Sequence, residues 1–569
     1  MNKNKTQQAY SEFQINIHKA LVGNLETVYN ICIILVCVIG GALAAQGITD
    51  ESVVATNGDM PKYLMNGVYF FDLARDILTG HIKGGNIFNH AVLYFSQYPA
   101  LSLGHHPILL GLTLPIFYTL FGISVCSARI MMISFFVMGI FFLFLLVRKI
   151  YNAQVALLAS LIFATTPFIV EYSQIVMSEV PTISLTILTS YLFYNYYESD
   201  KSIFAYLTAL TLVLSVYSKH LAIFIIPVFF LFFLLKKGKQ ALIRREVLIS
   251  SIGICLLLIP LVLITLKYSQ NDVASATTRS LRDRLSTTNL LFYAKMIWTD
   301  HLSHPIAILG GIGILSSLVL RDRRSVFFLL WIGSCYLMMV ALGVHKYPRY
   351  AVYWIPAFCV MAASLAAIPL REYARYLVIL IIIISIGYQA IGASKAPSYA
   401  GGYENAVEYV TGRPMGDVVL YSSVVDTGYF VYFMRKHDPD RSFIVLRSDK
   451  IFATSCMNRI VEDRISSRKD IYDLLQRYGV GYVVVEDYPS SSPALEWLRE
   501  EVKTDQFILR KTIPLRSDVG VLQGVSLNIF EYKHHTPGNP NEVIDMDIPL
   551  VGETFRVKLG DLLHSNRTN

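Results

Sequence analysis

Residues 129–147 read RIMMISFFVMGIFFLFLLV, a run in which Arg129 is the only charged side chain. A helix needs about 20 mostly apolar residues to cross the hydrocarbon core of a bilayer, so this run predicts a transmembrane helix. The whole chain fits that class, because 54% of its 569 residues are hydrophobic and only 16% are charged, against about 25% charged residues in soluble proteins. We therefore expect a polytopic α-helical membrane protein, and the composition excludes disordered, collagen-like and disulfide-scaffold proteins.

Ten further apolar runs resemble this one, so the sequence predicts about eleven spans. The first begins near Val28 and is too long for a cleaved signal peptide, which makes it a retained anchor. The seven cysteines show no disulfide or zinc spacing. The other predicted spans are Val28–Gln46, Val155–Val170, Val180–Tyr197, Ile203–Tyr217, Leu221–Leu235, Val247–Leu266, Pro305–Leu320, Val326–Val344, Tyr350–Ile368 and Tyr376–Ala393.

The apolar run Pro107–Phe121 is shorter and contains Pro115, and its class decides the topology. Basic loops of membrane proteins lie on the cytoplasmic side. If this run does not span, four basic connections share the side of the lysine-bearing amino terminus; if it spans, they lie opposite. We therefore predict a juxtamembrane helix in the outer leaflet, and a multi-pass protein of the cytoplasmic (inner) membrane with a cytoplasmic amino terminus. The basic connections are Arg148/Lys149, Lys236–Arg245, Arg321–Arg324 and Arg371/Arg375.

The chain divides into two predicted domains. Residues 1–394 form a transmembrane domain with a large first outer loop (47–126), and residues 395–569 are richer in charge and form an extracytoplasmic α/β domain. The net charge of +8 does not indicate nucleic acid, because the basic residues sit in short clusters between apolar runs. In the second domain we predict strands at Val418–Tyr421, Phe443–Arg447 and Tyr482–Val485, helices at Asp470–Tyr478 and Pro493–Val502, and a loosely ordered tail from about His534.

The centres of the predicted spans contain no charged residue, and the ionisable residues gather at their outer ends. Ion-coupled transporters usually retain charges inside the membrane, so we expect a reactive cavity at the outer membrane surface. Asp59 follows the first span and Glu179 ends the next outer turn. Both are candidate acid–base residues. A helix N-cap is the common role of an Asp before Pro61, and Glu179 beside Pro181 also suits a helix start.

Basic side chains on the same outer face are candidates for binding an anionic substrate, since Arg and Lys both hold phosphate groups. Single residues of this kind often contact lipid headgroups instead, but two basic turns on the side that is normally poor in positive charge argue for a site. His105 and His106 are adjacent and therefore lack a chelating i, i+4 spacing. We predict no metal site there. The candidates for substrate binding are Lys62, His105, His106, Lys219, His220, Lys346 and Arg349.

In this order, the motifs resemble the bacterial branch of the C-type membrane glycosyltransferase (GT-C) superfamily that contains protein O-mannosyltransferases and the lipid A aminoarabinose transferase. The resemblance covers about the first 400 residues. Tyr172-Ser173 stand where an Arg of the family would be expected. The matching segments are Asp59, Tyr63–Leu78, His105-His106-Pro107, Phe121-Gly122, Ala128-Arg129, Glu179, Lys219 and Lys346–Pro356.

The resemblance implies that a sugar moves from a polyprenyl-phosphate donor to an acceptor hydroxyl outside the membrane, with inversion. The acceptor would be a glycolipid, a glycan or a protein. Asp59 would be the general base and Glu179 would orient a substrate. Lys219, Lys346 and Arg349 would neutralise the leaving phosphate, so no cofactor is required, although a divalent cation beside Glu179 is an option.

Two other classes remain open from the sequence. A lipid-linked sugar flippase or exporter would explain the spans, but it should contain a polar pathway or repeat symmetry, and the sequence shows neither. A non-catalytic membrane scaffold would require Asp59 and Glu179 to lie far apart or to face lipid. The placement of these two carboxylates therefore discriminates between enzyme and scaffold.

Overall fold

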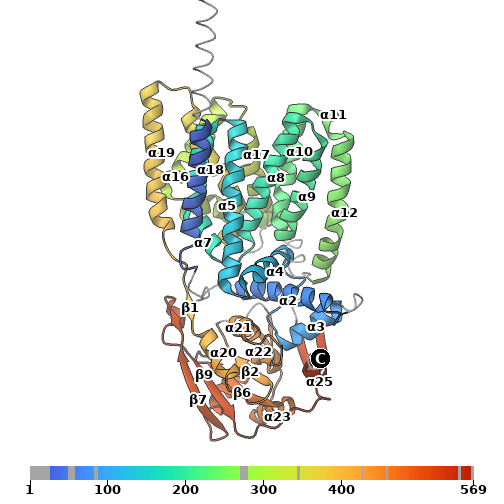
Figure 1. Cartoon of the computed structure of the whole chain (residues 1–569). Coiled ribbons are helices and arrows are strands. Elements are labelled where there is room, and N and C mark those ends of the chain that lie inside the picture. Colours follow the sequence, from blue (N-terminus) through green and yellow to red (C-terminus); the bar gives the residue numbers. More distant parts are fainter. Residues whose placement is uncertain are drawn as a thin grey trace, which may run out of the picture.

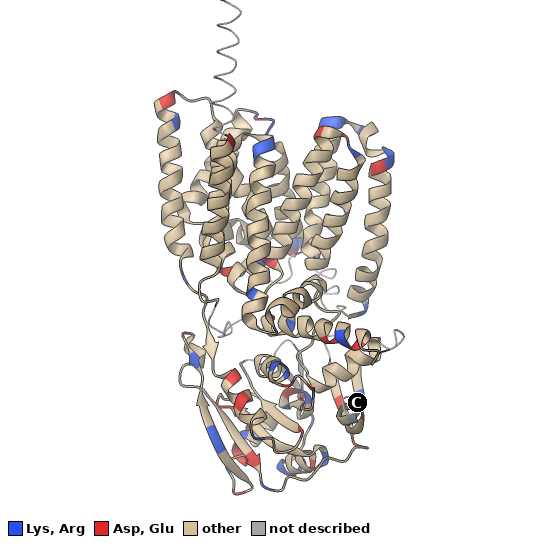
Figure 2. Cartoon of the chain, in the orientation of Figure 1, with Lys and Arg blue, Asp and Glu red and all other residues tan. Residues whose placement is uncertain are grey.

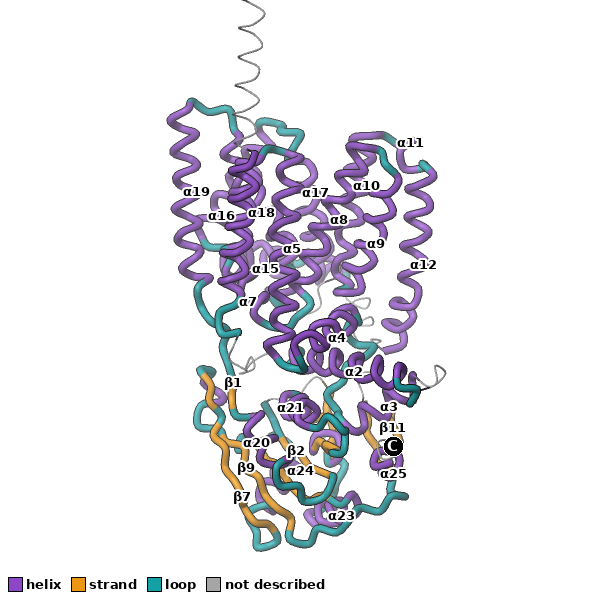
Figure 3. Tube along the Cα trace, viewed as in Figure 1, coloured by secondary structure: helices purple, strands orange, loops and turns teal. Residues whose placement is uncertain are grey.

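The computed structural model describes residues 26–48, 58–82, 87–268, 280–342, 346–425, 427–456, 459–548 and 553–564. It has three layers (Figure 1). A bundle of long helices forms one end, a mixed α/β domain forms the other, and the helices α2 (Met60–Leu78), α3 (Ile87–Gln97) and α4 (Leu109–Phe121) lie between them. Figure 3 shows that the strands are confined to the C-terminal part.

The bundle contains five helices that are long and apolar enough to cross a membrane, or six if one bent pair is counted as a span, among the residues that the structure describes. Five shorter apolar helices accompany them, so a multi-pass membrane protein is confirmed and the count of eleven spans stays a prediction. The bundle helices are Glu26–Ala44, α5 (Val125–Ile150), α6 (Ala153–Ala164), α7 (Pro167–Gln174), α8 (Glu179–Ser199), α9 (Ser202–Ser218), α10 (Ile225–Lys237), α12 (Arg245–Tyr268), α16 (His304–Val319), α17 (Val326–Leu342), α18 (Ile355–Ser364) and α19 (Glu372–Ala393).

Short elements connect these helices. Four of them are 3₁₀ helices and one is a π-helix, so their turns are tighter or wider than those of an α-helix. They are α11 (Lys239–Leu242), α14 (Leu281–Arg284), α15 (Thr287–Met296), the π-helix η2 (Ile297–His301) and the 3₁₀ helices η1 (His220–Phe224), η3 (Pro348–Tyr350), η4 (Val352–Trp354) and η5 (Leu365–Ala367).

The predicted continuous span Val155–Val170 is wrong, because α6 and α7 meet at a 57° bend. Pro167 begins α7, and a proline disfavours helical geometry in the residue before it; Thr166 accordingly has an extended backbone (φ −66°, ψ 115°). The break frees carbonyl groups that must find donors. Gln389 of α19 donates its side-chain amide to the Ile162 carbonyl (2.8 Å) and to the Thr165 hydroxyl (3.2 Å).

The predicted juxtamembrane run forms α4, which lies across the end of the bundle beside α2 (Figure 1). The two helices approach closely because Gly67 has no side chain: a Cβ there would lie 2.5 Å from Leu114 Cδ1. Apolar side chains on the other side of α4 remain exposed, namely Leu112, Ile116 and Leu120. This is the distribution expected of a helix at a lipid surface.

The C-terminal domain is built on a five-stranded sheet of order β3-β2-β6-β9-β7. The predicted strands and helices are all present. Strands β3, β2 and β6 are parallel, and β9 and β7 extend the sheet in antiparallel fashion. The elements are β1 (Ala400–Gly401), α20 (Tyr403–Thr411), β2 (Val418–Ser422), α21 (Tyr429–His437), β3 (Ile444–Arg447), α22 (Ser448–Ile451), β4 (Ala453–Cys456), β5 (Arg459–Asp463), α23 (Arg468–Tyr478), β6 (Val480–Glu486), α24 (Pro493–Glu501), β7 (Phe507–Pro514), β8 (Arg516–Ser517), η6 (Gly520–Leu522) and β9 (Ser526–Tyr532).

The expectation of a loosely ordered tail after His534 is wrong. The strands β10 (Val543–Ile548) and β11 (Glu553–Lys558) pair in antiparallel register, and α25 (Leu559–His564) follows them. This hairpin packs against α3, where the rings of Phe95 and Phe555 meet edge to face at 5.7 Å. Prolines and glycines in residues 537–540 marked a turn rather than the end of the ordered chain.

Gly313 of α16 is the position where the bundle tolerates a side chain least. A Cβ there would lie 2.0 Å from the Met361 carbonyl oxygen of α18. We predict that Gly313→Ala destabilises the protein by about 1–3 kcal/mol, the usual cost of overpacking, in unfolding of the detergent-solubilised protein. Gly311→Ala on the same helix meets nothing within 4 Å and is the matched control. Equal stability of the two variants would contradict the close contact of α16 and α18.

Candidate functional site

Asp59 lies at the N-terminal end of α2, where the bundle meets the layer formed by α2, α3 and α4. It occupies the N-cap position, but its side chain makes no capping hydrogen bond. Its carboxylate instead faces cations: Arg349 Nη2 lies 3.1 Å from Oδ2, and Lys62 Nζ lies 3.3 Å from Oδ1. The helix-cap interpretation of this side chain is therefore wrong, and the sequence prediction of a charged site around Asp59 gains a geometric basis.

The backbone turn that carries Arg349 is held by hydrogen bonds to buried side chains. It lies in the 3₁₀ helix η3, and His301 Nε2 lies 2.8 Å from the carbonyl oxygen of Pro348. The Trp354 indole N–H donates to His301 Nδ1 (3.0 Å), so the proton of the neutral imidazole is on Nε2 and is donated to that carbonyl. Trp354 and His301 are both about 1% exposed. This buried relay was not predicted from the sequence.

Glu179 forms the second charged centre. It begins α8 and is fully buried, and Lys219 Nζ at the end of α9 donates to its Oε1 at 2.5 Å. Ser178 and Glu179 provide no side-chain cap for α8. The partner of Glu179, left open by the missing arginine near Tyr172, is thus a lysine 40 residues further along the chain.

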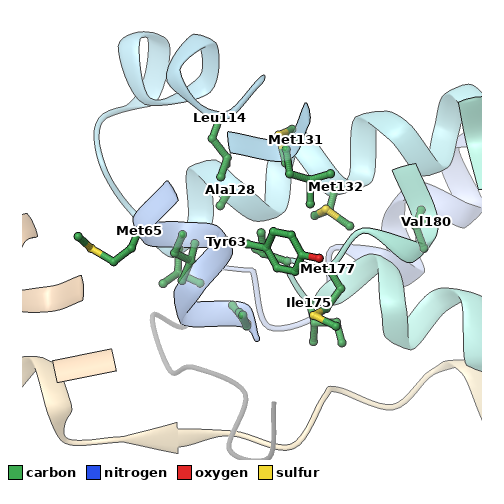
Figure 4. Packing of buried hydrophobic residues seen from close by; sticks show 14 of the residues in the cluster. Tyr63, Met65, Leu114, Ala128, Met131, Met132, Ile175, Met177 and Val180 are labelled. Atoms are coloured by element: carbon green, nitrogen blue, oxygen red, sulfur yellow. The ribbon is translucent and has the colours of Figure 1, made fainter. Parts of the chain in front are cut away.

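Two tyrosines join the centres. The Tyr63 hydroxyl donates to Ser178 Oγ at 3.2 Å, directly beside Glu179, and Figure 4 shows the Tyr63 ring next to Met177 in the turn before α8. The ring of Tyr350 lies between the cations, with Lys219 Nζ 5.2 Å and Arg349 Cζ 5.4 Å from its centroid. Asp59 and Glu179 therefore belong to one cluster, to which four different parts of the chain contribute.

The histidine pair also reaches this cluster. His106 Nε2 lies 3.7 Å from Asp59 Oδ1, and its ring contacts Tyr63 with centroids 4.9 Å apart. His105 packs against His106 at 4.7 Å. The loop is held to α2 because the Ser102 backbone N–H donates to Asn66 Oδ1 (2.9 Å).

The other two predicted binding residues are His220, which directly follows Lys219, and Lys346. His220 Nε2 is 3.0 Å from Thr265 Oγ1 of α12. Lys346 is exposed, and its ammonium lies 5.6 Å from the ring of Phe292. Neither forms an ion pair with Asp59 or Glu179 among the described residues. The structure thus groups Lys62, His105, His106, Lys219 and Arg349 with the acids, and it leaves Lys346 at the rim.

The charges of the cluster fix its protonation. Burial would raise the pKa of Asp59, but the contact with His106 and the charges of Lys62 and Arg349 outweigh it and lower the pKa well below the usual range. Burial lowers the pKa of His105 to about 3, assisted by His106 and Lys62, and it also lowers that of His106. At neutral pH Asp59 is therefore ionised and the imidazole of His105 is neutral.

This donor set does not fit a divalent cation. Asp59 and Glu179 are each neutralised by their own cations, and Arg349 and Lys219 would repel a metal from the space they share. In the described part of the chain, one group of three possible ligands lies elsewhere, in the C-terminal domain: Glu404, Glu408 and His437. Glu404 already accepts from Lys436 at 2.8 Å, so its carboxylate serves an ion pair there.

Several buried polar atoms in and beside the cluster have no hydrogen-bond partner among the described residues, and Glu179 Oε2 and the Tyr353 hydroxyl are two of them. Both residues are almost completely inaccessible. Unpaired buried polar atoms are rare in folded proteins, and they suit a bound polar group.

Comparisons with known proteins point to one superfamily. A family model described as dolichyl-phosphate-mannose-protein mannosyltransferase matches residues 105–264, and a search of the curated proteins finds no match. Among solved structures, ArnT from Cupriavidus metallidurans in the apo state aligns with a TM-score of 0.58 at 12% identity, over 89% of this chain and 98% of that one. The chain has the GT-C fold. It resembles the C-type membrane glycosyltransferases, as its motifs predicted.

Two further structures agree with this fold. The same ArnT bound to undecaprenyl phosphate gives a TM-score of 0.58 at 11% identity, over 88% of this chain and 98% of that one. The oligosaccharyltransferase of Archaeoglobus fulgidus, in complex with zinc and sulfate, gives 0.51 at 14% identity, over 79% and 68%. The likeness extends beyond the bundle, since 89% coverage of this chain requires part of the C-terminal domain.

The buried pair Glu179–Lys219 yields a stability prediction. Lys219→Met leaves a carboxylate without its counter-charge, which costs about 3–5 kcal/mol, whereas removing both charges is often nearly neutral. We therefore expect Lys219→Met to destabilise the GT-C bundle strongly and Lys219→Met/Glu179→Gln to recover most of the loss, measured by unfolding in a denaturing detergent. A double variant as unstable as the sum of the single variants would contradict the pairing.

Proposed function

We propose that this protein is a glycosyltransferase that moves a sugar from a polyprenyl-phosphate donor to an acceptor hydroxyl, with inversion, at the outer face of the cytoplasmic membrane. One observation carries the proposal: Asp59 and Glu179, each paired to a cation, converge on one cluster at the end of the bundle that faces the C-terminal domain. This convergence argues against a non-catalytic scaffold. The GT-C fold and the relative bound to undecaprenyl phosphate support the same donor class.

The cations explain how the leaving group would be stabilised. As the bond between the anomeric carbon and the phosphate oxygen breaks, negative charge grows on the polyprenyl phosphate. Arg349 offers a bidentate fork and Lys219 a compact charge, and Lys62 stands beside them. Fixed charges of this kind usually supply the largest share of catalysis.

Asp59 would accept the proton of the acceptor hydroxyl while its oxygen attacks the anomeric carbon. Without substrate it is a weak base, because the contact with His106 and the charges of Lys62 and Arg349 lower its pKa. A phosphate that draws Arg349 away removes part of this charge, so the pKa of Asp59 rises when the donor binds. Asp59 would thereby become a stronger base only after the donor has bound.

Glu179 and Tyr353 would orient the sugar. Their unpaired atoms Glu179 Oε2 and Tyr353 Oη suit sugar hydroxyl groups, which both donate and accept hydrogen bonds. The other oxygen of Glu179, Oε1, accepts from Lys219. Lys346 at the rim, near Phe292, would meet the lipid phosphate or headgroups.

The proposed orientation follows from charge. In Figure 2 the Lys and Arg residues mark the bundle end far from the C-terminal domain, and Arg148, Lys149, Lys236 and Lys237 end their helices there. The positive-inside rule puts that end in the cytoplasm. We accordingly propose a transmembrane domain of residues 1–394 and an extracytoplasmic domain of residues 395–569.

Reporter fusions test this orientation. A phosphatase that is active only outside the cytoplasm should be active when fused after Asn569 and inactive when fused after Leu370, between α18 and α19. The reverse pattern would contradict the assigned sides of both domains.

Asp59→Asn tests the base. The purified parent should transfer sugar from at least one member of a panel of radiolabelled polyprenyl-phosphate sugars, and Asp59→Asn should lower kcat by about 10²–10⁴-fold, the range of general base catalysis. The matched control is Asp322→Asn, whose carboxylate pairs with Arg324 at the other end of the bundle.

Activity in the presence of a chelator should equal that in its absence, because the cluster does not fit a divalent cation. Full activity of Asp59→Asn would contradict the role of Asp59. Absence of turnover by the parent with every donor would contradict the transferase proposal itself.

A further inference from the structure

The C-terminal domain contacts α2 through ion pairs that lie outside the cluster around Asp59. Arg435, in α21, forks onto Asp72 of α2, with Nη2 2.6 Å from Oδ1 and Nε 2.9 Å from Oδ2. Both side chains are almost fully buried, at 1% and 0% exposure. Tyr94 of α3 donates its hydroxyl to the same carboxylate at 2.6 Å.

A second fork lies one helical turn further along α2. Arg441 donates through Nη1 to Asp76 Oδ2 (2.6 Å) and through Nη2 to Oδ1 (2.9 Å). Residues four apart share one face of a helix, so Asp72 and Asp76 present a pair of carboxylates to the C-terminal domain. Two bidentate contacts on one face fix both the rotation of α2 and its position along its axis.

The helix α3 and the segment after it are attached to the same region. The side-chain amide of Gln97 donates to the carbonyls of Arg441 (2.6 Å) and Phe443 (2.9 Å). Tyr98 donates to Asp438 Oδ2 at 2.7 Å, and Arg447 donates to the Pro99 carbonyl at 2.7 Å. The loop that continues from Pro99 leads to His105 and His106 in the site.

These contacts act at a distance from the chemistry. Asp72 follows Asp59 by thirteen residues on one continuous helix, which corresponds to about 20 Å at the α-helical rise. A buried ion pair adds little stability compared with apolar packing, and its best-attested use is to specify one geometry. The two bidentate ion pairs are therefore suited to set the position of α2, and they contribute little to the free energy that holds the two domains together.

We propose that the C-terminal domain is a positioning domain for the catalytic site: Asp72–Arg435 and Asp76–Arg441 hold α2 so that Asp59 faces Arg349. This proposal rests on the proposed function for its catalytic consequence. Asp72, Asp76, Arg435 and Arg441 are positioning residues, since none of them lies in the cluster around Asp59.

The test uses the full-length protein in lipid nanodiscs, with two readouts. The first is kcat and KM for the polyprenyl-phosphate sugar. The second is hydrogen–deuterium exchange of residues 60–70 in α2, compared with β6 and β9 in the core of the C-terminal domain. Asp72→Asn removes one charge without changing side-chain size, and Arg435→Lys keeps the charge but loses the fork.

We expect Asp72→Asn to lower kcat by about 10–100-fold, the scale of a small misplacement of catalytic groups, with KM changed less than kcat. Exchange should rise in α2 and stay unchanged in β6 and β9. Arg435→Lys should lie between the parent and Asp72→Asn. Arg468→Gln, which loses ion pairs with Glu500 and Glu501 in the C-terminal domain, is the control and should change neither readout.

Unchanged kcat together with unchanged exchange in α2 would overturn the proposal, as would exchange that rises in β6 and β9 as much as in α2. Asp76→Asn is the second variant if Asp72→Asn does not fold, with the same expectations. If the parent has no activity with any donor, the proposed function fails, but the exchange readout still decides: a rise confined to α2 supports the positioning role and no rise overturns it.

Discussion

A carboxylate that is shielded from water needs a cation as its partner, and this requirement shapes the junction of the bundle and the C-terminal domain. An ionised group away from water loses several kcal/mol of hydration, so it persists only beside a cation with good geometry. Four carboxylates at the junction of the bundle and the C-terminal domain meet this condition, and each pairs with a cation from a distant part of the chain. The pairs are Asp59–Arg349, Glu179–Lys219, Asp72–Arg435 and Asp76–Arg441.

The helix α2 links these pairs into one unit. Its first residues contribute to the cluster around Asp59, and its later turns meet the C-terminal domain through Asp72 and Asp76. Its apolar face packs on α4, where Gly67 permits close approach to Leu114. The helix α2 therefore connects the cluster around Asp59 with both the bundle and the C-terminal domain.

Much of the fold could be predicted from hydrophobic runs, because a bilayer imposes length and composition on each span. The strands β2, β3 and β6 were also predictable, since fully buried parallel strands read as short apolar runs. The bend between α6 and α7 was missed although Pro167 signals it, because apolar composition continues through the break. The hairpin of β10 and β11 was missed because prolines and glycines before it resembled a disordered tail.

The site was predictable as a set of residues but not as pairs. Charges at one end of the predicted spans singled out Asp59, Glu179, Lys219 and Arg349 as candidates, since charged side chains are costly to keep near lipid. Nothing in the sequence separation of Glu179 and Lys219 indicates their contact, which depends on how α8 and α9 pack. The forks on Asp72 and Asp76 were missed for the same reason, as their partners lie more than 360 residues away.

The cations beside Asp59 and Glu179 are proposed to bind the phosphate of a polyprenyl lipid. The most direct measurement is equilibrium binding of a polyprenyl monophosphate to the protein in nanodiscs, with the polyprenol of the same length as reference. The account predicts that the phosphate lipid binds at least about tenfold more tightly than the alcohol, the scale of one charge-assisted contact, and that Arg349→Gln removes most of this difference. Equal affinity for the two lipids, or a preference that survives Arg349→Gln together with Lys219→Met/Glu179→Gln, would contradict it.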